Sequence, residues 1–173
     1  LNMIVKNESK IITRLLDSVL PIIDTYCICD TGSTDDTIAI IQRYFNEREI
    51  VGRVVHEPFK NFAHNRNYAI KEAKGMADYL LFIDADMVLI VSETFSKKQL
   101  TDKAYYIEQV CGALVYSNLR LIRSEIEITC QGVTHEYYSH KERTSLIHGL
   151  KITDVGDGGC KGDKFDRDLR LLL

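Results

Sequence analysis

The first 84 residues alternate short apolar runs with amphipathic segments, and this alternation restricts the fold more than any other feature of the sequence. Four apolar runs, each bounded by polar turn residues, are expected strands: residues 2–5, 25–30, 52–56 and 78–84. Segments with helical periodicity lie between them. Strands that alternate with helices predict a parallel sheet with helices on its faces.

Three helices are expected between these strands. In the first, apolar residues recur at three- and four-residue steps from residue 11 to residue 19, and Pro21 ends it. The second is expected to begin at Ser33, an N-cap with Asp36 three positions later. The third spans residues 64–74 and is expected to end at Gly75, because glycine adopts the left-handed conformation at little cost.

The pattern changes after residue 91. Apolar runs at 105–110, 114–122 and 125–130 follow one another without helices between them, which favours antiparallel pairing. The expected fold is therefore of the α/β class, a three-layer α/β/α sandwich with a mostly parallel central sheet and a small antiparallel patch. Residues 1–173 form one expected domain, with halves at 1–90 and 91–173, and both ends look cut because they fall within apolar runs.

The composition excludes several classes of function. The 22 basic and 25 acidic residues are mixed along the chain and give a net charge of -3, so no nucleic-acid partner is expected. No apolar stretch approaches the roughly 20 residues that span a bilayer, and no signal peptide opens the sequence, which predicts a cytoplasmic location without a membrane span. The five cysteines include no Cys-x-x-Cys pair and are expected to be reduced and mostly buried. No feature of the sequence indicates the oligomeric state.

Polar residues follow three of the expected strands, where open α/β sheets bind their ligands. The segments are Lys6-Asn7-Glu8-Ser9, then Asp30 with residues 31–36 behind it, and Asp84-Ala85-Asp86. Asp30 is placed to accept hydrogen bonds from a base or ribose, or else to hold an Asx turn. One of the two acids Asp35 and Asp36 is expected to cap the following helix.

Asp84 and Asp86 follow the apolar run Leu80-Leu81-Phe82-Ile83 directly. Two carboxylates at the mouth of a core strand repel each other and are costly to desolvate, and a divalent cation with hard oxygen ligands relieves both costs. The sequence therefore predicts a Mn²⁺ or Mg²⁺ site, with Asp86 as the better candidate for direct ligation and Asp84 beside it. The alternative is that both acids cap a turn.

Taken together, residues 3–8, 30–35 and 84–86 resemble, in order and spacing, the family 2 glycosyltransferases with the GT-A fold. The segment Asn61-Phe62-Ala63-His64-Asn65-Arg66-Asn67 resembles the family's segment ahead of the metal motif. The resemblance implies an inverting transfer of a sugar from a nucleoside-diphosphate sugar. Uridine is the family's commonest donor base, and the acceptor, whether carbohydrate, lipid or protein, is not identified by the sequence.

The resemblance also implies roles for particular residues. Glu8 and Asp30 would hold the nucleoside, Arg66 would lie near the nucleotide or its phosphates, and Asp84 would share the donor side of the site. Glu136 is nominated as the general base, although the family's usual paired acids are absent there, so that His135 could instead position phosphates beside a structural glutamate. His148 is a candidate third metal ligand, with a core histidine as the alternative. A lid over the diphosphate is the role considered for Lys161, Lys164 and Arg167, and the alternative is a solvated helix face.

Two other functions remain open at this level. Asp84 and Asp86 after an apolar strand also match the nucleophile and second acid of a haloacid-dehalogenase-like phosphatase. That reading gives no role to residues 6–9 and 30–35. A catalytically silent domain that binds a nucleotide sugar is the non-enzymatic alternative.

Overall fold

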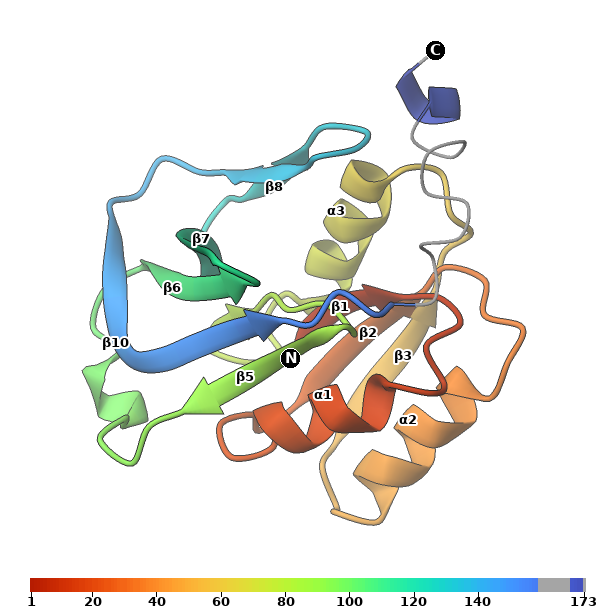
Figure 1. Ribbon diagram of the computed structural model, residues 1–173, viewed down its shortest axis with the longest axis horizontal. Coiled ribbons are helices and arrows are strands. Elements are labelled where there is room, and N and C mark those ends of the chain that lie inside the picture. The colour runs from red at the N-terminus through yellow and green to blue at the C-terminus, as the bar shows by residue number, and fades with distance from the viewer. Residues whose placement is uncertain (159–168, 173) are drawn as a thin grey trace.

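The computed structural model describes residues 1–158 and 169–172. Its first part alternates strands and helices (Figure 1): β1 (Asn2–Val5), α1 (Ile12–Val19), β2 (Tyr26–Asp30), α2 (Thr37–Asn46), β3 (Gly52–His56), α3 (Phe62–Ala73) and β4 (Tyr79–Leu81). The second part is mostly strands: β5 (Met87–Val91), the short helix η1 (Lys97–Gln99), β6 (Ala104–Cys111), β7 (Leu114–Arg123), β8 (Thr129–Gln131), β9 (Tyr137–Ser139) and β10 (Thr144–Asp154).

The first three strands form a parallel sheet in the order β1-β2-β3. Successive side chains of β2 point to opposite faces of this sheet. Ile28 packs in a core cluster with Leu15 of α1 and Phe45 of α2. Its neighbour Cys27 packs in a second cluster with Ile70 of α3. Helices α1 and α2 therefore cover one face and α3 covers the other (Figure 1), which confirms the expected layers.

The second sheet has the order β4-β7-β6-β10-β5. Its pairs are antiparallel except for β10 with β6, which is parallel. A parallel bridge between Asn2 and Phe82 joins it to the first sheet. The antiparallel part is more extensive than the small patch expected. The additional antiparallel pairing is between β5 and β10. His148 and Gly149 lie within β10, at the place where its pairing with β6 shifts register between Leu146 and Lys151.

Two helix starts differ from expectation. α2 begins after Asp36, and Ser33 does not cap it, because the Ser33 hydroxyl instead accepts a hydrogen bond from the Asn7 backbone N–H at 3.0 Å. Asp35 supplies the first-turn contact, since its carboxylate accepts from the N–H of Thr37 at 3.1 Å. α3 begins at Phe62 rather than at residue 64, because the Asn61 side chain caps it. Gly75, with φ of +77°, follows the helix as expected.

The cysteines in the described part of the chain are free thiols. Cys27, Cys29 and Cys130 are buried, and Cys111 is exposed. Burial raises the pKa of the Cys29 thiol to about 12 and that of Cys130 to about 12, so neither is a ready nucleophile. Cys160 lies outside the described residues. Within residues 1–158 and 169–172, no helix has the length and apolar character needed to cross a bilayer.

Candidate active site

The acidic residues predicted from the sequence gather at one edge of the molecule. β1 and β2 run parallel, so Glu8, which follows β1, and Asp30, which ends β2, lie at the same edge. Asp84 and Asp86 come to this edge because Phe82 bridges to Asn2 in the same direction. This is the position where open α/β sheets bind ligands.

Asp30 is buried and holds the turn that follows β2. Its carboxylate accepts hydrogen bonds from the backbone N–H groups of Ser33 at 3.0 Å and Gly32 at 3.3 Å. Gly32 has φ of +112°, a conformation that suits glycine. The imidazole Nδ1 of the exposed His56 lies 3.3 Å from the same carboxylate. The Asx-turn role is thus confirmed, and contact with a nucleoside stays a prediction.

Arg66 joins two carboxylates from different parts of the chain. Its Nη2 donates to Asp84 Oδ1 at 2.9 Å, and its Nε donates to Glu136 Oε1 at 2.8 Å. Burial by itself lowers the pKa of Arg66, but the nearby charges of Asp84 and Glu136 outweigh it and hold that pKa well above its ordinary value. The guanidinium therefore stays charged, and the structure brings three predicted site residues into one cluster.

A second buried arginine, which the sequence analysis missed, also faces Asp84. Arg120 Nη1 of β7 lies 3.6 Å from Asp84 Oδ2. Burial raises the pKa of Asp84, but Arg66 and then Arg120 outweigh that effect and keep the pKa below its usual value. The available signal was a charged residue between Leu119 and Leu121 in an apolar run, because arginine is rarely buried there without a partner.

The segment after β10 crosses the site beside Asp86. The N–H of Val155 donates to the Asp86 carbonyl at 3.0 Å. A Cβ built on Gly158 would lie 3.2 Å from Asp86 Oδ2 and 3.3 Å from Glu8 Oε1, so both carboxylates approach the same point. Arg14 of α1, another residue not anticipated, anchors this segment by donating to both carboxylate oxygens of Asp157 at 2.8 and 2.6 Å.

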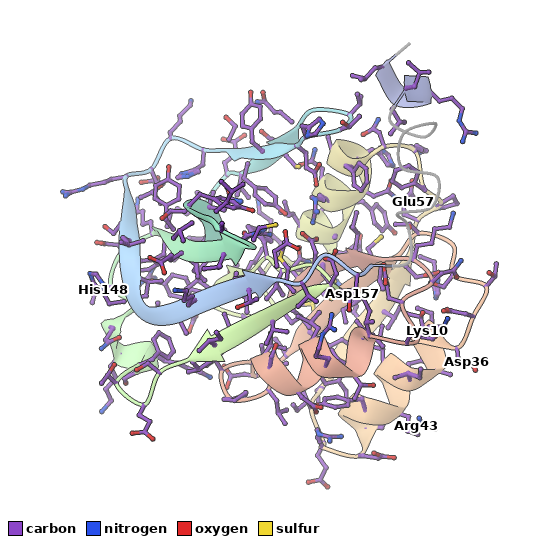
Figure 2. All side chains as sticks on the ribbon, in the orientation of Figure 1. Lys10, Asp36, Arg43, Glu57, His148 and Asp157 are labelled. Carbon is purple, nitrogen blue, oxygen red and sulfur yellow. The ribbon has the colours of Figure 1, made fainter. Side chains whose placement is uncertain are left out.

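His148 is not part of this cluster, which corrects its prediction as a third metal ligand. The register of β10 pairs Asp154 with Met87, next to Asp86, and Leu150 with Val91 at the far end of β5. His148 lies beyond that far end and is exposed. Figure 2 shows it well separated from Asp157. The prediction failed because His148 lies inside the eleven-residue strand β10, in the half of it that is remote from Asp86. Lys161, Lys164 and Arg167 lie outside the described residues.

The donor groups available for a metal ion are few. Among the residues described, no group of three or more His, Cys, Asp or Glu side chains is arranged to hold a metal. Asp84 is engaged by two guanidinium groups, whereas Asp86 and Glu8 bring carboxylate oxygens to one point. Such a set fits Mg²⁺ or Mn²⁺, because Mg²⁺ is commonly bound by one or two carboxylates together with substrate phosphates and water.

Comparison with known proteins shows the family of the chain. Residues 2–113, more than half of the chain, match the family described as glycosyl transferase family 2. The chain therefore belongs to glycosyl transferase family 2. It is 32% identical over 169 residues to the SPbeta prophage-derived glycosyltransferase SunS of Bacillus subtilis. It is 30% identical over 148 residues to a chondroitin synthase of Escherichia coli.

These relatives are longer proteins. The match to SunS covers 88% of this chain and 38% of that protein, and the match to chondroitin synthase covers 82% and 20%. Among solved structures, S. aureus TarS 1-349 in complex with UDP-GlcNAc aligns with a TM-score of 0.58 and 16% identity, over 98% of this chain and 64% of that chain. The structural likeness confirms the GT-A-like α/β fold.

Proposed function

We propose that this chain carries the catalytic site of a metal-dependent glycosyltransferase that moves a sugar from a UDP-sugar to an acceptor with inversion. The observation that carries the proposal is the convergence of Glu8, Arg66 and Asp84 with Asp86 at the carboxyl edge of the sheet. Membership of family 2 supports it, as does the solved S. aureus TarS fold, whose structures include complexes with UDP and UDP-GlcNAc.

The residues of this edge have distinct tasks in the proposed reaction. Asp30 and Glu8 accept hydrogen bonds from the nucleoside, since both are carboxylates at the ends of adjacent strands. Asp84, which Arg66 and Arg120 hold in place, contacts the donor beside these two arginines. Its oxygens each retain acceptor capacity, because a carboxylate oxygen has two lone pairs and each one here meets one guanidinium.

Metal binding is assigned to Asp86, with Glu8 nearby. A bound Mn²⁺ or Mg²⁺ would supply Lewis-acid stabilisation of charge on the departing diphosphate. Asp86 is suited to this task because its carboxylate and that of Glu8 approach one point, where a divalent cation with oxygen ligands relieves the repulsion between like charges. Gly158 lies beside the same point.

Glu136 is proposed as the general base toward the acceptor. It is positioned on the loop between β8 and β9, and Arg66 holds it through Oε1.

The phosphatase alternative loses support for a specific reason. A phosphatase of the haloacid-dehalogenase type gives no role to Glu8 and Asp30, which the strand pairing brings to the same edge as Asp84. Family membership also favours a transferase. A silent binding domain is harder to separate from an enzyme, because both would bind the donor.

Calorimetry with UDP, GDP and Mn²⁺ tests the proposal. We expect UDP to bind more tightly than GDP and to require the metal. Release of UDP from a UDP-sugar then separates an enzyme from a silent domain. Failure to bind any nucleoside diphosphate in the presence of Mn²⁺ would overturn the proposed function.

A further inference from the structure

Where β6 and β7 pair, residues 114–122 of β7 lie opposite residues 104–111 of β6, so β7 has one extra residue there, which is Arg120. Tyr105 of β6 pairs with Leu121, and the next residue, Tyr106, pairs with Leu119. Arg120 is therefore the extra residue of a β-bulge. Bulges re-aim a side chain and are found more often than expected beside active sites. Here the bulge turns a guanidinium into the protein, where Arg120 is 7% exposed.

The buried guanidinium is fixed by a side chain of the neighbouring strand. Nη2 and Nε of Arg120 donate to Gln109 Oε1 at 2.8 and 3.2 Å. Gln109 is 1% exposed, and its own amide nitrogen donates to the hydroxyl of Tyr116 at 2.8 Å. This second bond directs the Gln109 oxygen toward Arg120. The chain of contacts from Tyr116 through Gln109 therefore sets the direction of the guanidinium.

The remaining nitrogen of Arg120 points to the strand that delivers the acidic pair. Nη1 lies 3.5 Å from the carbonyl oxygen of Phe82 and 3.6 Å from Asp84 Oδ2. Arg66 holds the other oxygen of the same carboxylate. Two cations on opposite oxygens fix the rotation of the carboxylate about its Cβ–Cγ bond, which a single contact does not do. A buried cation is costly unless it is paired, so Arg120 needs such a role.

We propose that Arg120 is a positioning residue that, together with Gln109, holds Asp84 in the orientation in which it contacts the donor. The inference rests on the proposed function and deepens it, because it extends the donor site to the β6–β7 hairpin in the second half of the chain. Arg120 itself does not touch the donor. Its effect on donor binding must therefore pass through Asp84.

A double-mutant cycle in the whole chain measures that dependence. UDP affinity in the presence of Mn²⁺ is determined by calorimetry for the unchanged protein, Arg120→Gln, Asp84→Asn and the double variant. We expect Arg120→Gln to weaken UDP binding about tenfold, as for loss of a charged contact, and to have little further effect when Asp84 is already Asn. Arg120→Lys keeps the charge and should recover part of the affinity.

The chain offers a matched control and a milder variant. Arg123 lies three residues further along β7, where it stacks on Tyr79 away from Asp84, so Arg123→Gln should leave UDP affinity unchanged. Gln109→Leu keeps Arg120 but removes the oxygen that accepts its hydrogen bonds, and should weaken UDP binding about threefold. This variant tests the proposal even if Arg120→Gln fails to fold. Unchanged affinity in Gln109→Leu and Arg120→Gln, or additive effects in the cycle, would overturn the positioning role alone. Absence of UDP binding by the unchanged protein would overturn the proposed function and this role with it.

Discussion

Arg66 donates a hydrogen bond from Nε to Oε1 of Glu136 across 2.8 Å, and this contact ties α3 to the loop between β8 and β9. Both side chains are largely buried. The same guanidinium also binds Asp84 at 2.9 Å. One buried cation thus separates two carboxylates that reach the site from distant parts of the chain. Its removal would leave like charges facing each other in a poorly solvated space.

Replacing Arg66 by Met should destabilise the fold strongly. The change takes from Glu136 the cation that pairs with it and from Asp84 one of its two, and leaving a buried charge unpaired costs about 3 kcal/mol or more. Urea unfolding measures the change in the free energy of unfolding. Arg53→Met is the control, because Arg53 is exposed and its pair with the partly exposed Glu72 is expected to contribute at most about 1 kcal/mol. Equal losses of unfolding free energy in the two variants would contradict the role of Arg66 in stabilising the fold.

Replacing Glu136 by Gln should lower turnover much more than donor affinity. A glutamine oxygen can still accept from Arg66, so the fold is kept, but the side chain can no longer take a proton from the acceptor. We expect turnover to fall about 100-fold or more. Release of UDP from a UDP-sugar reports turnover, and calorimetry reports the affinity for UDP. A parallel loss of affinity would instead assign Glu136 to the nucleotide.

Replacing Asp86 by Asn should remove the effect of Mn²⁺ on UDP binding. The change keeps the size of the side chain and removes the charge that would hold the metal. Calorimetry with and without Mn²⁺ measures the difference. His148→Ala is the matched control and should leave the Mn²⁺ effect unchanged, because His148 lies beyond the far end of β5. If His148→Ala and not Asp86→Asn abolished the metal dependence, the site would have been placed wrongly.

The stability contributed by Asp35 should disappear in acid. Partial burial raises the pKa of Asp35, but hydrogen bonds from Thr37 and Ser9 outweigh it and bring the pKa down to about 2. A carboxyl whose folded pKa lies below its ordinary value of 3.8 stabilises the fold above that value and loses this contribution as pH falls toward 2.

Thermal unfolding of Asp35→Ala between pH 2 and 6 tests this. The variant should be less stable by about 1 kcal/mol at pH 6, as for loss of a helix cap, and the gap should close near pH 2. Asp36→Ala serves as the control, because Asp36 makes no capping bond with its side chain. A gap that stays constant down to pH 2 would show that the ionised carboxylate is not its source.

The sequence predicted the first half of the fold well because its signals are local. Apolar periodicity and the glycine at residue 75 act within one element, and the carboxyl ends of parallel strands bring Glu8, Asp30 and Asp84 together by topology alone. The family resemblance added Arg66 and Glu136, which the structure joins directly. The roles of these residues in catalysis, the metal and the cytoplasmic location stay predictions.

What the sequence did not reveal depends on distant pairing. Arg120 acts through a bulge whose existence follows from the register of two strands, not from residues 119–121 themselves. Arg14 gains its role from Asp157, which lies 143 positions away. His148 was misplaced because β10 passes through a glycine and keeps its pairing after a register shift. Each of these required knowledge of which strands become neighbours.

The parallel bridge between Asn2 and Phe82 is the narrow seam along which the two sheets meet. Glu8 follows a strand on one side of that seam, and Asp86 follows a strand on the other. The two carboxylates nearest Gly158 thus follow strands of two different sheets. A small rotation of one sheet relative to the other would change the distance between these two charges. The geometry of the acidic centre therefore depends on the relative orientation of the two sheets.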